Sequence, residues 1–133
     1  PEDIALIMGF WESVGSIVKK IGVMQHDAIY AAVSHLPHLL SYALMASVVN
    51  SEDADQKLDH VGAGFKDFTR IAASSPEMWR DICIGNRTAI LQELDRYLLI
   101  VNHMRKLVSE GDGEGLEKLF NKASKARQDL DEA

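Results

Sequence analysis

The chain has 133 residues, a length that suits one domain able to bury most of its unfolded surface. Hydrophobic residues make up 47% and charged residues 26%, which is the balance of a globular protein and excludes general disorder. The net charge is -6 and no cluster of Lys and Arg occurs, which argues against nucleic acid as a partner. The single cysteine, Cys83, excludes an intrachain disulfide and favours a reducing, cytoplasmic location.

The first predicted helix covers residues 3–21. Its apolar side chains recur at steps of three and four residues, which is the period of one buried helical face. Lys19 and Lys20 lie near its expected C-terminal end, and Gly22 follows as a stop signal.

The second predicted helix, residues 26–49, lies in the most apolar part of the chain. No Asp, Glu, Lys or Arg occurs from Ala28 to Ser51, and Pro37 is expected to kink the helix because it removes a backbone hydrogen bond. This run is long enough to cross a bilayer. The histidines, the proline and the serines within it favour a helix buried in a protein core instead, so no membrane partner is expected.

The remaining elements also carry helical signals. A third helix is expected over residues 58–73, loosened in the middle by the glycines of GAGF, and Ser75 followed by Pro76 is a strong start signal for a short fourth helix. Asn86 can cap a long fifth helix that ends at GDGEG, and a last helix should fold back on it as a hairpin. The sequence therefore predicts an all-α domain of about six helices around a long, buried, proline-kinked central helix.

Three histidines of the central helix are candidate functional residues. On an ideal helix His35 and His38 lie roughly 60° apart, whereas His26 lies roughly 120° from His38 and roughly 180° from His35. This geometry argues against a metal site, because the helix offers at most two ligands to one point. The simplest interpretation of each imidazole alone is a hydrogen-bonded group within the core.

A second candidate is GAGFKDFTRIA, residues 62–72. Lys66, Asp67 and Arg70 share one helical face, which fits a solvated face with an Asp67–Arg70 pair. It equally fits an anion site in which Arg70 presents its planar guanidinium to a carboxylate, with glycines that let backbone approach the ligand. The residues alone leave both interpretations open.

Two long stretches, HDAIYAAVSHLPHLLSYAL and GAGFKDFTRIAASSPEMWRDICIGN, together resemble the C-terminal helical domain of the prephenate dehydrogenase family, which includes arogenate and cyclohexadienyl dehydrogenases. The likeness extends over nearly the whole chain, so residues 1–133 are expected to form that domain. The resemblance implies an enzyme of tyrosine biosynthesis that oxidises prephenate with NAD or NADP, releases carbon dioxide and yields 4-hydroxyphenylpyruvate. The arogenate form yields tyrosine directly.

The resemblance also implies roles for individual residues. His26, His38 and Arg70 match substrate-binding positions, with Arg70 gripping a carboxylate, and the substrate wall falls at Gly64, Phe65 and Trp79. His35 and Pro37 match structural positions of the motif. Ala63 departs from the glycine that relatives often carry, which weakens the expectation of close backbone approach there. No catalytic residue and no metal ligand is expected in this chain.

The family resemblance further implies what lies outside the chain. The Rossmann domain that binds NAD or NADP and supplies the catalytic histidine is absent from these residues, so the chain alone is expected to form a homodimer but to be inactive. Prephenate or arogenate is the expected ligand, and tyrosine is a possible feedback ligand of the same pocket. The alternatives are a non-catalytic dimerising or ligand-sensing module, and the helical domain of another Rossmann oxidoreductase.

Overall fold

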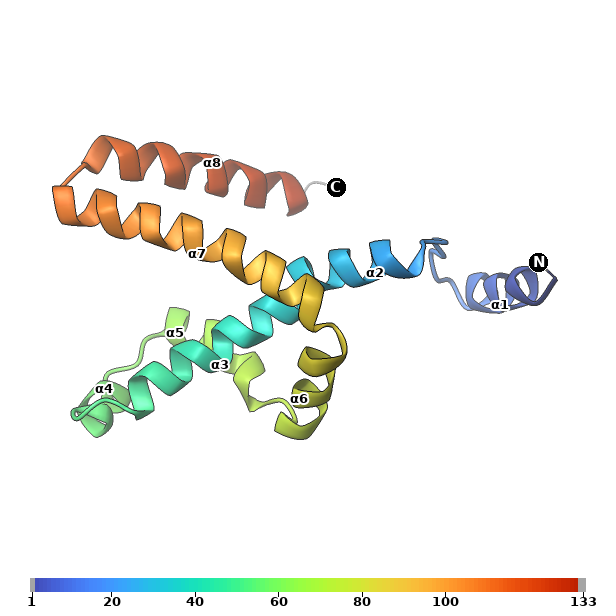
Figure 1. The fold of residues 1–133 in the computed structure, drawn as a ribbon, viewed down its shortest axis with the longest axis horizontal. Coiled ribbons are helices and arrows are strands. Elements are labelled where there is room, and N and C mark those ends of the chain that lie inside the picture. Colours follow the sequence, from blue (N-terminus) through green and yellow to red (C-terminus); the bar gives the residue numbers. More distant parts are fainter. Residues whose placement is uncertain (1, 132–133) are drawn as a thin grey trace.

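The computed structural model describes residues 2–131, and every regular element within them is helical. The predicted all-α class is confirmed, with eight α-helices in this part of the chain (Figure 1). Their bounds are α1 Glu2–Ser13, α2 Val23–Tyr30, α3 Leu36–Val49, α4 Ala54–Asp59, α5 Ala63–Thr69, α6 Pro76–Gly85, α7 Arg87–Glu110 and α8 Gly113–Asp131. A π-helical turn, η1 (Ala31–His35), joins α2 to α3, and a 3-10 turn, η2 (Arg70–Ala73), follows α5.

The central element is a continuous rod, Val23–Val49, made of α2, η1 and α3. It begins three residues before the predicted start. The distortion expected at Pro37 is present as the π turn that ends two residues earlier, because a proline ring displaces the carbonyl four residues before it and supplies no N–H. Within residues 2–131 this rod is the one helix apolar and long enough to suit a membrane, a test that core helices also pass.

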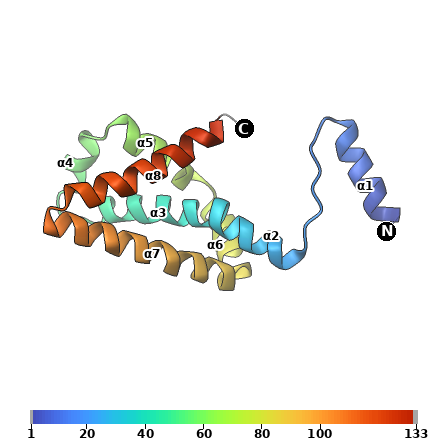
Figure 2. The same cartoon turned by 90° about the horizontal axis from the view of Figure 1, so that it is seen from above.

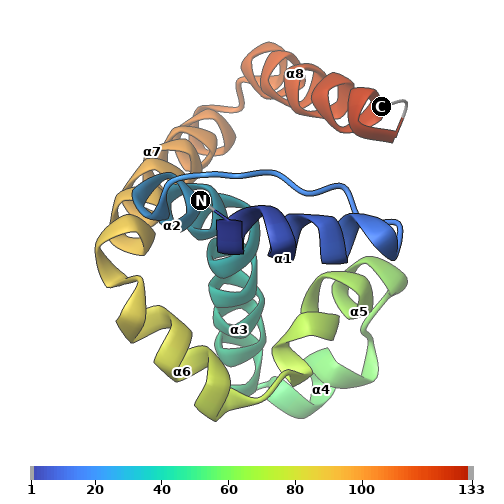
Figure 3. The same cartoon turned by 90° about the vertical axis from the view of Figure 1, so that its right-hand side faces the viewer.

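The other helices of the body surround α3. It packs against η1, α4, α5, η2 and α7, and Figure 3 shows α3 between α6 on one side and α4 and α5 on the other. Of the residues in the rod, however, only three are buried within one chain: Ala31, Leu36 and Ser41. The complete burial predicted for the central helix is therefore not achieved by a single chain.

Two adjacent residues of α3 fasten the segment that carries Arg70. The Ser41 hydroxyl, fully buried, donates to the carbonyl of Phe68 at 3.0 Å. The Tyr42 hydroxyl donates to the carbonyl of Ser74 at 2.6 Å. Because these bonds lie on either side of η2, they hold its backbone against the rod.

Several helix boundaries differ from the predictions. The first helix ends at Ser13 because Gly15 takes a left-handed φ of 87°, and an extended segment then runs to Gly22. The third predicted helix is divided into α4, α5 and η2, with α4 ending before Gly62. The start at Ser75 is confirmed, since its hydroxyl accepts from the Met78 N–H at 3.4 Å.

The last two helices form the predicted hairpin. Gly111 closes α7 with a left-handed φ of 67°, and α8 begins inside GDGEG, with the Asp112 side chain accepting from the Gly115 N–H at 2.8 Å. Only α7 is a substantial packing partner of α8 among the described helices, and α1 stands apart from the body (Figures 1 and 2).

Candidate functional site

The candidate site lies where the π turn meets α6 and the start of α7. His26, His35 and His38, here called the histidine cluster, come from α2, η1 and α3. His35 and His38 both contact Trp79 of α6, whereas His26 contacts Asp27 and Tyr30 of its own helix. The π turn takes more residues per turn, so side-chain directions before and after it differ from those on an ideal helix.

His38 and Trp79 form the closest contact of the site. Their rings stack with centroids 3.5 Å apart and planes at 19°. The Nδ1 atom of His38 lies 2.9 Å from the carbonyl oxygen of Ser34. Because a carbonyl can only accept, this nitrogen carries a proton, and Nε2 of the neutral ring is left as an acceptor.

His35 is half-buried, as His38 is, whereas His26 is exposed. The ring of His35 meets Trp79 edge-on at 6.2 Å, and its Nδ1 lies 3.2 Å from Nδ2 of Asn86. Burial lowers the pKa of His35, the positive charges of His26 and His38 lower it further, and Asp27 opposes them. The predicted structural role of His35 agrees with these packing contacts.

His26 is the most open member of the cluster. Its side chain is 51% exposed, its Nδ1 lies 3.2 Å from a carboxylate oxygen of Asp27, and its ring lies 4.3 Å from that of Tyr30. An exposed imidazole beside a carboxylate is able to bind a ligand without first breaking a core contact.

Trp79 is the buried centre of the site. It is 8% exposed, and its indole Nε1 is buried with no hydrogen-bond partner among the described residues. An unpaired buried donor is costly, so an acceptor from a ligand or another chain would stabilise it.

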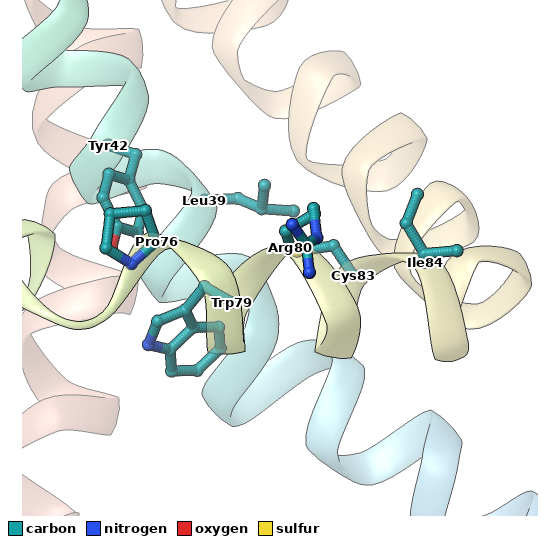
Figure 4. Close-up of a pocket in the computed structure, with 7 residues that line it drawn as sticks. All are labelled: Leu39, Tyr42, Pro76, Trp79, Arg80, Cys83 and Ile84. Carbon is teal, nitrogen blue, oxygen red and sulfur yellow. The ribbon is translucent and has the colours of Figure 1, made fainter.

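A pocket of about 360 Å³, lined in part by Trp79, lies between α3 and α6 (Figure 4). Figure 4 shows Tyr42 and Pro76 at one end and Ile84 at the other, with Arg80 and Cys83 between them. Burial raises the pKa of the Cys83 thiol, which leaves it protonated and unreactive at neutral pH. Trp79 is the one predicted site residue that lines this pocket.

The structure does not place Arg70 in the histidine cluster. Arg70 opens η2, its side chain is exposed, and within residues 2–131 its guanidinium makes no hydrogen bond or ion pair. The alternative Asp67–Arg70 pair is likewise not formed. The bonds from Ser41 and Tyr42 hold the backbone on either side of Arg70 against α3, and the guanidinium lies on the exposed surface of η2.

The predicted wall residues of α5 are only partly in place. Phe65 is half-buried and its carbonyl accepts from the Thr69 hydroxyl at 2.7 Å. A Cβ added at Gly64 would meet nothing within 4 Å, so no close approach at this glycine occurs within the chain. No group of three His, Cys, Asp or Glu side chains in the described range is arranged to hold a metal ion.

Sequence reasoning missed three residues that organise this region. Asn86 was recognised as a candidate cap, but its side chain makes no cap bond and instead reaches His35 and the carbonyl of Asp27. Ser41 and Tyr42 are polar residues within the uncharged run from Ala28 to Ser51. Uncharged polar groups in an apolar run signal that these side chains need hydrogen-bond partners. The sequence does not identify those partners.

Comparison with known proteins gives one consistent result. Residues 23–122 match the family described as the dimerization domain of prephenate dehydrogenase. The cyclohexadienyl dehydrogenase of Zymomonas mobilis is 33% identical over 126 residues, which cover 93% of this chain and 43% of that protein. The prephenate dehydrogenase of Bacillus subtilis is 36% identical over 107 residues, which cover 80% of this chain and 29% of that protein.

A solved structure agrees with the sequence matches. The prephenate dehydrogenase from A. aeolicus, in complex with hydroxyphenyl propionate and NAD+, superposes with a TM-score of 0.87 at 33% identity, covering 97% of this chain and 46% of that one. The chain thus spans less than half the length of these relatives. The helical fold, the two motifs around the histidine cluster and these matches together show that the chain belongs to the dimerization-domain family of prephenate dehydrogenases.

Proposed function

We propose that this chain is the dimerization and substrate-binding domain of a prephenate or arogenate dehydrogenase of tyrosine biosynthesis. The complete protein would oxidise its substrate with NAD or NADP and release carbon dioxide. Support comes from the family match and from a relative that binds both NAD+ and a hydroxyphenyl compound.

The observation that carries the substrate role is the arrangement around Trp79. His38 stacks on its face, His35 meets it edge-on, and its buried Nε1–H has no acceptor among the described residues. A ring compound with carboxylate and hydroxyl oxygens would supply the missing acceptor. Arg70, Gly64 and Phe65 are proposed to complete the substrate wall, with Arg70 binding a carboxylate through paired N–H groups.

The residues of this chain would bind and orient the substrate, and the hydride acceptor would come from the cofactor. Within residues 2–131 there is no strand and hence no strand–loop–helix unit for a dinucleotide. Cofactor binding and the catalytic acid–base group are proposed to lie in another part of the complete protein, and the chain alone is expected to be inactive.

A homodimer is proposed from the exposed surface. The chain has 10720 Å² of accessible surface, whereas a compact monomer of its mass would have about 7,000 Å². The excess matches the extensive interfaces of obligate dimers. We further propose a cytoplasmic location, and tyrosine as a feedback ligand of the same pocket because product and substrate share a ring and a carboxylate.

The test uses the complete protein. Reduction of NAD and of NADP is measured with prephenate and with arogenate, for the wild type and for Arg70→Ala. We expect turnover of at least one substrate, and a KM raised at least about tenfold by Arg70→Ala with a smaller change in kcat, because a charge-assisted carboxylate bond is lost.

The matched control is Arg96→Ala, which removes an exposed arginine that pairs only with Glu93. Its kinetic constants should stay at the wild-type values. No oxidation of either substrate would reject the proposed function, and an unchanged KM in Arg70→Ala would remove Arg70 from the site.

A further inference from the structure

Asn86 occupies an unusual position for a residue that begins a long helix. Its backbone carbonyl accepts from the Ile90 N–H at 3.1 Å, as expected at the start of α7, but its side chain caps nothing. Instead, Nδ2 lies 2.8 Å from the carbonyl oxygen of Asp27 and 3.2 Å from Nδ1 of His35. One amide group therefore ties the start of α7 to α2 and to the π turn.

These two contacts determine the protonation pattern of His35. The Asp27 carbonyl can only accept, so the amide must present its NH2 group to it. The second hydrogen of the same NH2 group then points to Nδ1 of His35, which must accept. The neutral His35 ring consequently carries its proton on Nε2, the opposite arrangement to His38, whose Nδ1 donates to Ser34.

We propose that Asn86 is a positioning residue of the substrate site, whose side-chain amide holds His35 as the Nε2–H tautomer and anchors the π turn, and so sets the place of His38 against Trp79 and of His26 beside Asp27. The inference rests on the proposed function and adds a residue to it. The Asn86 side chain contacts Asp27 and His35, and it acts on the proposed substrate-binding histidines only through the π turn.

The tautomer of His35 matters because the site is proposed to bind a carboxylate, and the protonation of each imidazole decides whether it can donate to that ligand. Protonation of His35 at Nδ1 would place an N–H against the Asn86 NH2 group, so Asn86 keeps this ring neutral. The ionisable groups that act on His35 are His26 and Asp27 from α2 and His38 from α3. Trp79 from α6 and Asn86 from α7 add only uncharged contacts.

The π turn gives the amide a second role. Pro37 distorts the helix upstream, and irregular turns of this kind open the regular ladder of backbone bonds. The Asp27 carbonyl receives a side-chain donor from α7, which adds a fixed contact at the start of the distortion. His26 and Asp27 are adjacent, so a shift of this carbonyl moves His26.

The test compares Asn86→Asp with the wild type in the complete protein. Aspartate has the shape of asparagine but cannot donate to the Asp27 carbonyl, and its carboxylate favours a proton on Nδ1 of His35. Ring 15N chemical shifts of His35 report the tautomer, and kcat and KM are measured from about pH 5 to about pH 9. Asn102→Asp is the control, because it adds the same charge on an exposed position of α7.

In the wild type we expect an unprotonated Nδ1 and a protonated Nε2 at neutral pH. In Asn86→Asp we expect a protonated Nδ1, a KM about five- to tenfold higher, a smaller change in kcat, and an acidic limb of kcat/KM shifted to higher pH. Asn102→Asp should match the wild type. If Asn86→Asp does not fold, Asn86→Ser replaces it, since serine still caps a helix but is too short to bridge both acceptors.

Two results would overturn the proposal. A wild-type spectrum with the His35 proton on Nδ1 would show that the amide does not set the tautomer. Wild-type KM and pH dependence in Asn86→Asp or Asn86→Ser would show that the tautomer does not act on the site. A wild-type protein inactive with both substrates would reject the proposed function and the substrate role of Asn86, while the spectrum would still report the tautomer.

Discussion

The body around α3 and the two arms, α1 and α8, are stabilised in different ways. In the body, side chains bond to backbone far away in sequence: Ser41 to Phe68, Tyr42 to Ser74 and Asn86 to Asp27. By contrast, none of the described residues of α1 or α8 is buried. The body is thus positioned by polar contacts within the chain, whereas the arms are extended and open.

The open arms still carry large apolar side chains. Leu6, Phe10 and Trp11 of α1 are exposed, as are Phe120 and Leu130 of α8. A chain gains little from helices that leave such residues in water, since burial of apolar area is the main source of stability. This difference between body and arms supports the proposed homodimer, in which a second copy of the chain would cover the arms.

The largest expected effect comes from placing a charge among the exposed apolar side chains of α8. Phe120→Asp in the complete protein should convert the dimer to monomer, with a Kd at least about 100-fold weaker, because a twofold interface loses two buried aromatic side chains. Light scattering after size-exclusion chromatography measures the mass. Asn121→Asp adds the same charge on an exposed site of the same helix and should leave the dimer intact. If the Phe120→Asp protein is still a dimer, α8 does not lie in the dimer interface.

A tryptophan in each region gives a direct comparison. Trp79→Ala should lower the free energy of unfolding by about 3–5 kcal/mol, because it removes a large buried ring and leaves a cavity beside His38. Trp11→Ala in α1, where the side chain is 51% exposed, should cost less. Urea denaturation at a fixed protein concentration measures both. Equal losses would show that α1 is as tightly packed as the body.

The polar contacts of the body are tested at Ser41. Ser41→Ala leaves the Phe68 carbonyl without its donor in a buried place, so we expect a loss of about 1–3 kcal/mol of unfolding free energy. Ser47→Ala on the same helix removes an exposed bond to the carbonyl of Leu44 and should change stability by less than about 0.5 kcal/mol. If Arg70 binds substrate, Ser41→Ala should also raise KM. Equal stability of the two variants would show that Ser41 does not fasten η2.

Local signals in the sequence predicted most of the helices. The apolar period of α7, the hydroxyl of Ser75 before Pro76, and the glycines after Glu110 depend on neighbours within a few residues, and each is confirmed. The end of α1 was missed because two valid signals competed: the apolar period continues to Ile21, but Gly15 favours a left-handed φ and stops the helix.

The arrangement of the site depended on contacts that no local pattern contains. Pro37 predicted a distortion but not that it would widen the preceding turn and leave His35 and His38 both against Trp79. The partners of Asn86 lie 51 and 59 residues away, so its tertiary role could not be distinguished from helix capping. The motif around Arg70 predicted a helical turn there. It did not predict where the Arg70 side chain points, because that depends on contacts from outside the local sequence.

The smallest expected effect concerns the pH dependence of the body. His35 has a pKa below its ordinary value, first because it is buried and then because of the charges of His26 and His38, with Asp27 opposing. The unfolded chain therefore binds a proton at His35 at a pH where the native chain does not, and stability falls as pH drops from about 6.5 toward the lowered native pKa. His35→Asn should remove this part of the loss, because asparagine does not titrate and its carbonyl can still accept from Asn86. Urea midpoints measured across this range for the wild type, for His35→Asn and for His103→Asn, an exposed α7 histidine, separate the contributions. A wild-type pH dependence in His35→Asn would show that the body does not hold this imidazole neutral, and would leave the polar contacts at Ser41 and Tyr42 as its distinguishing feature.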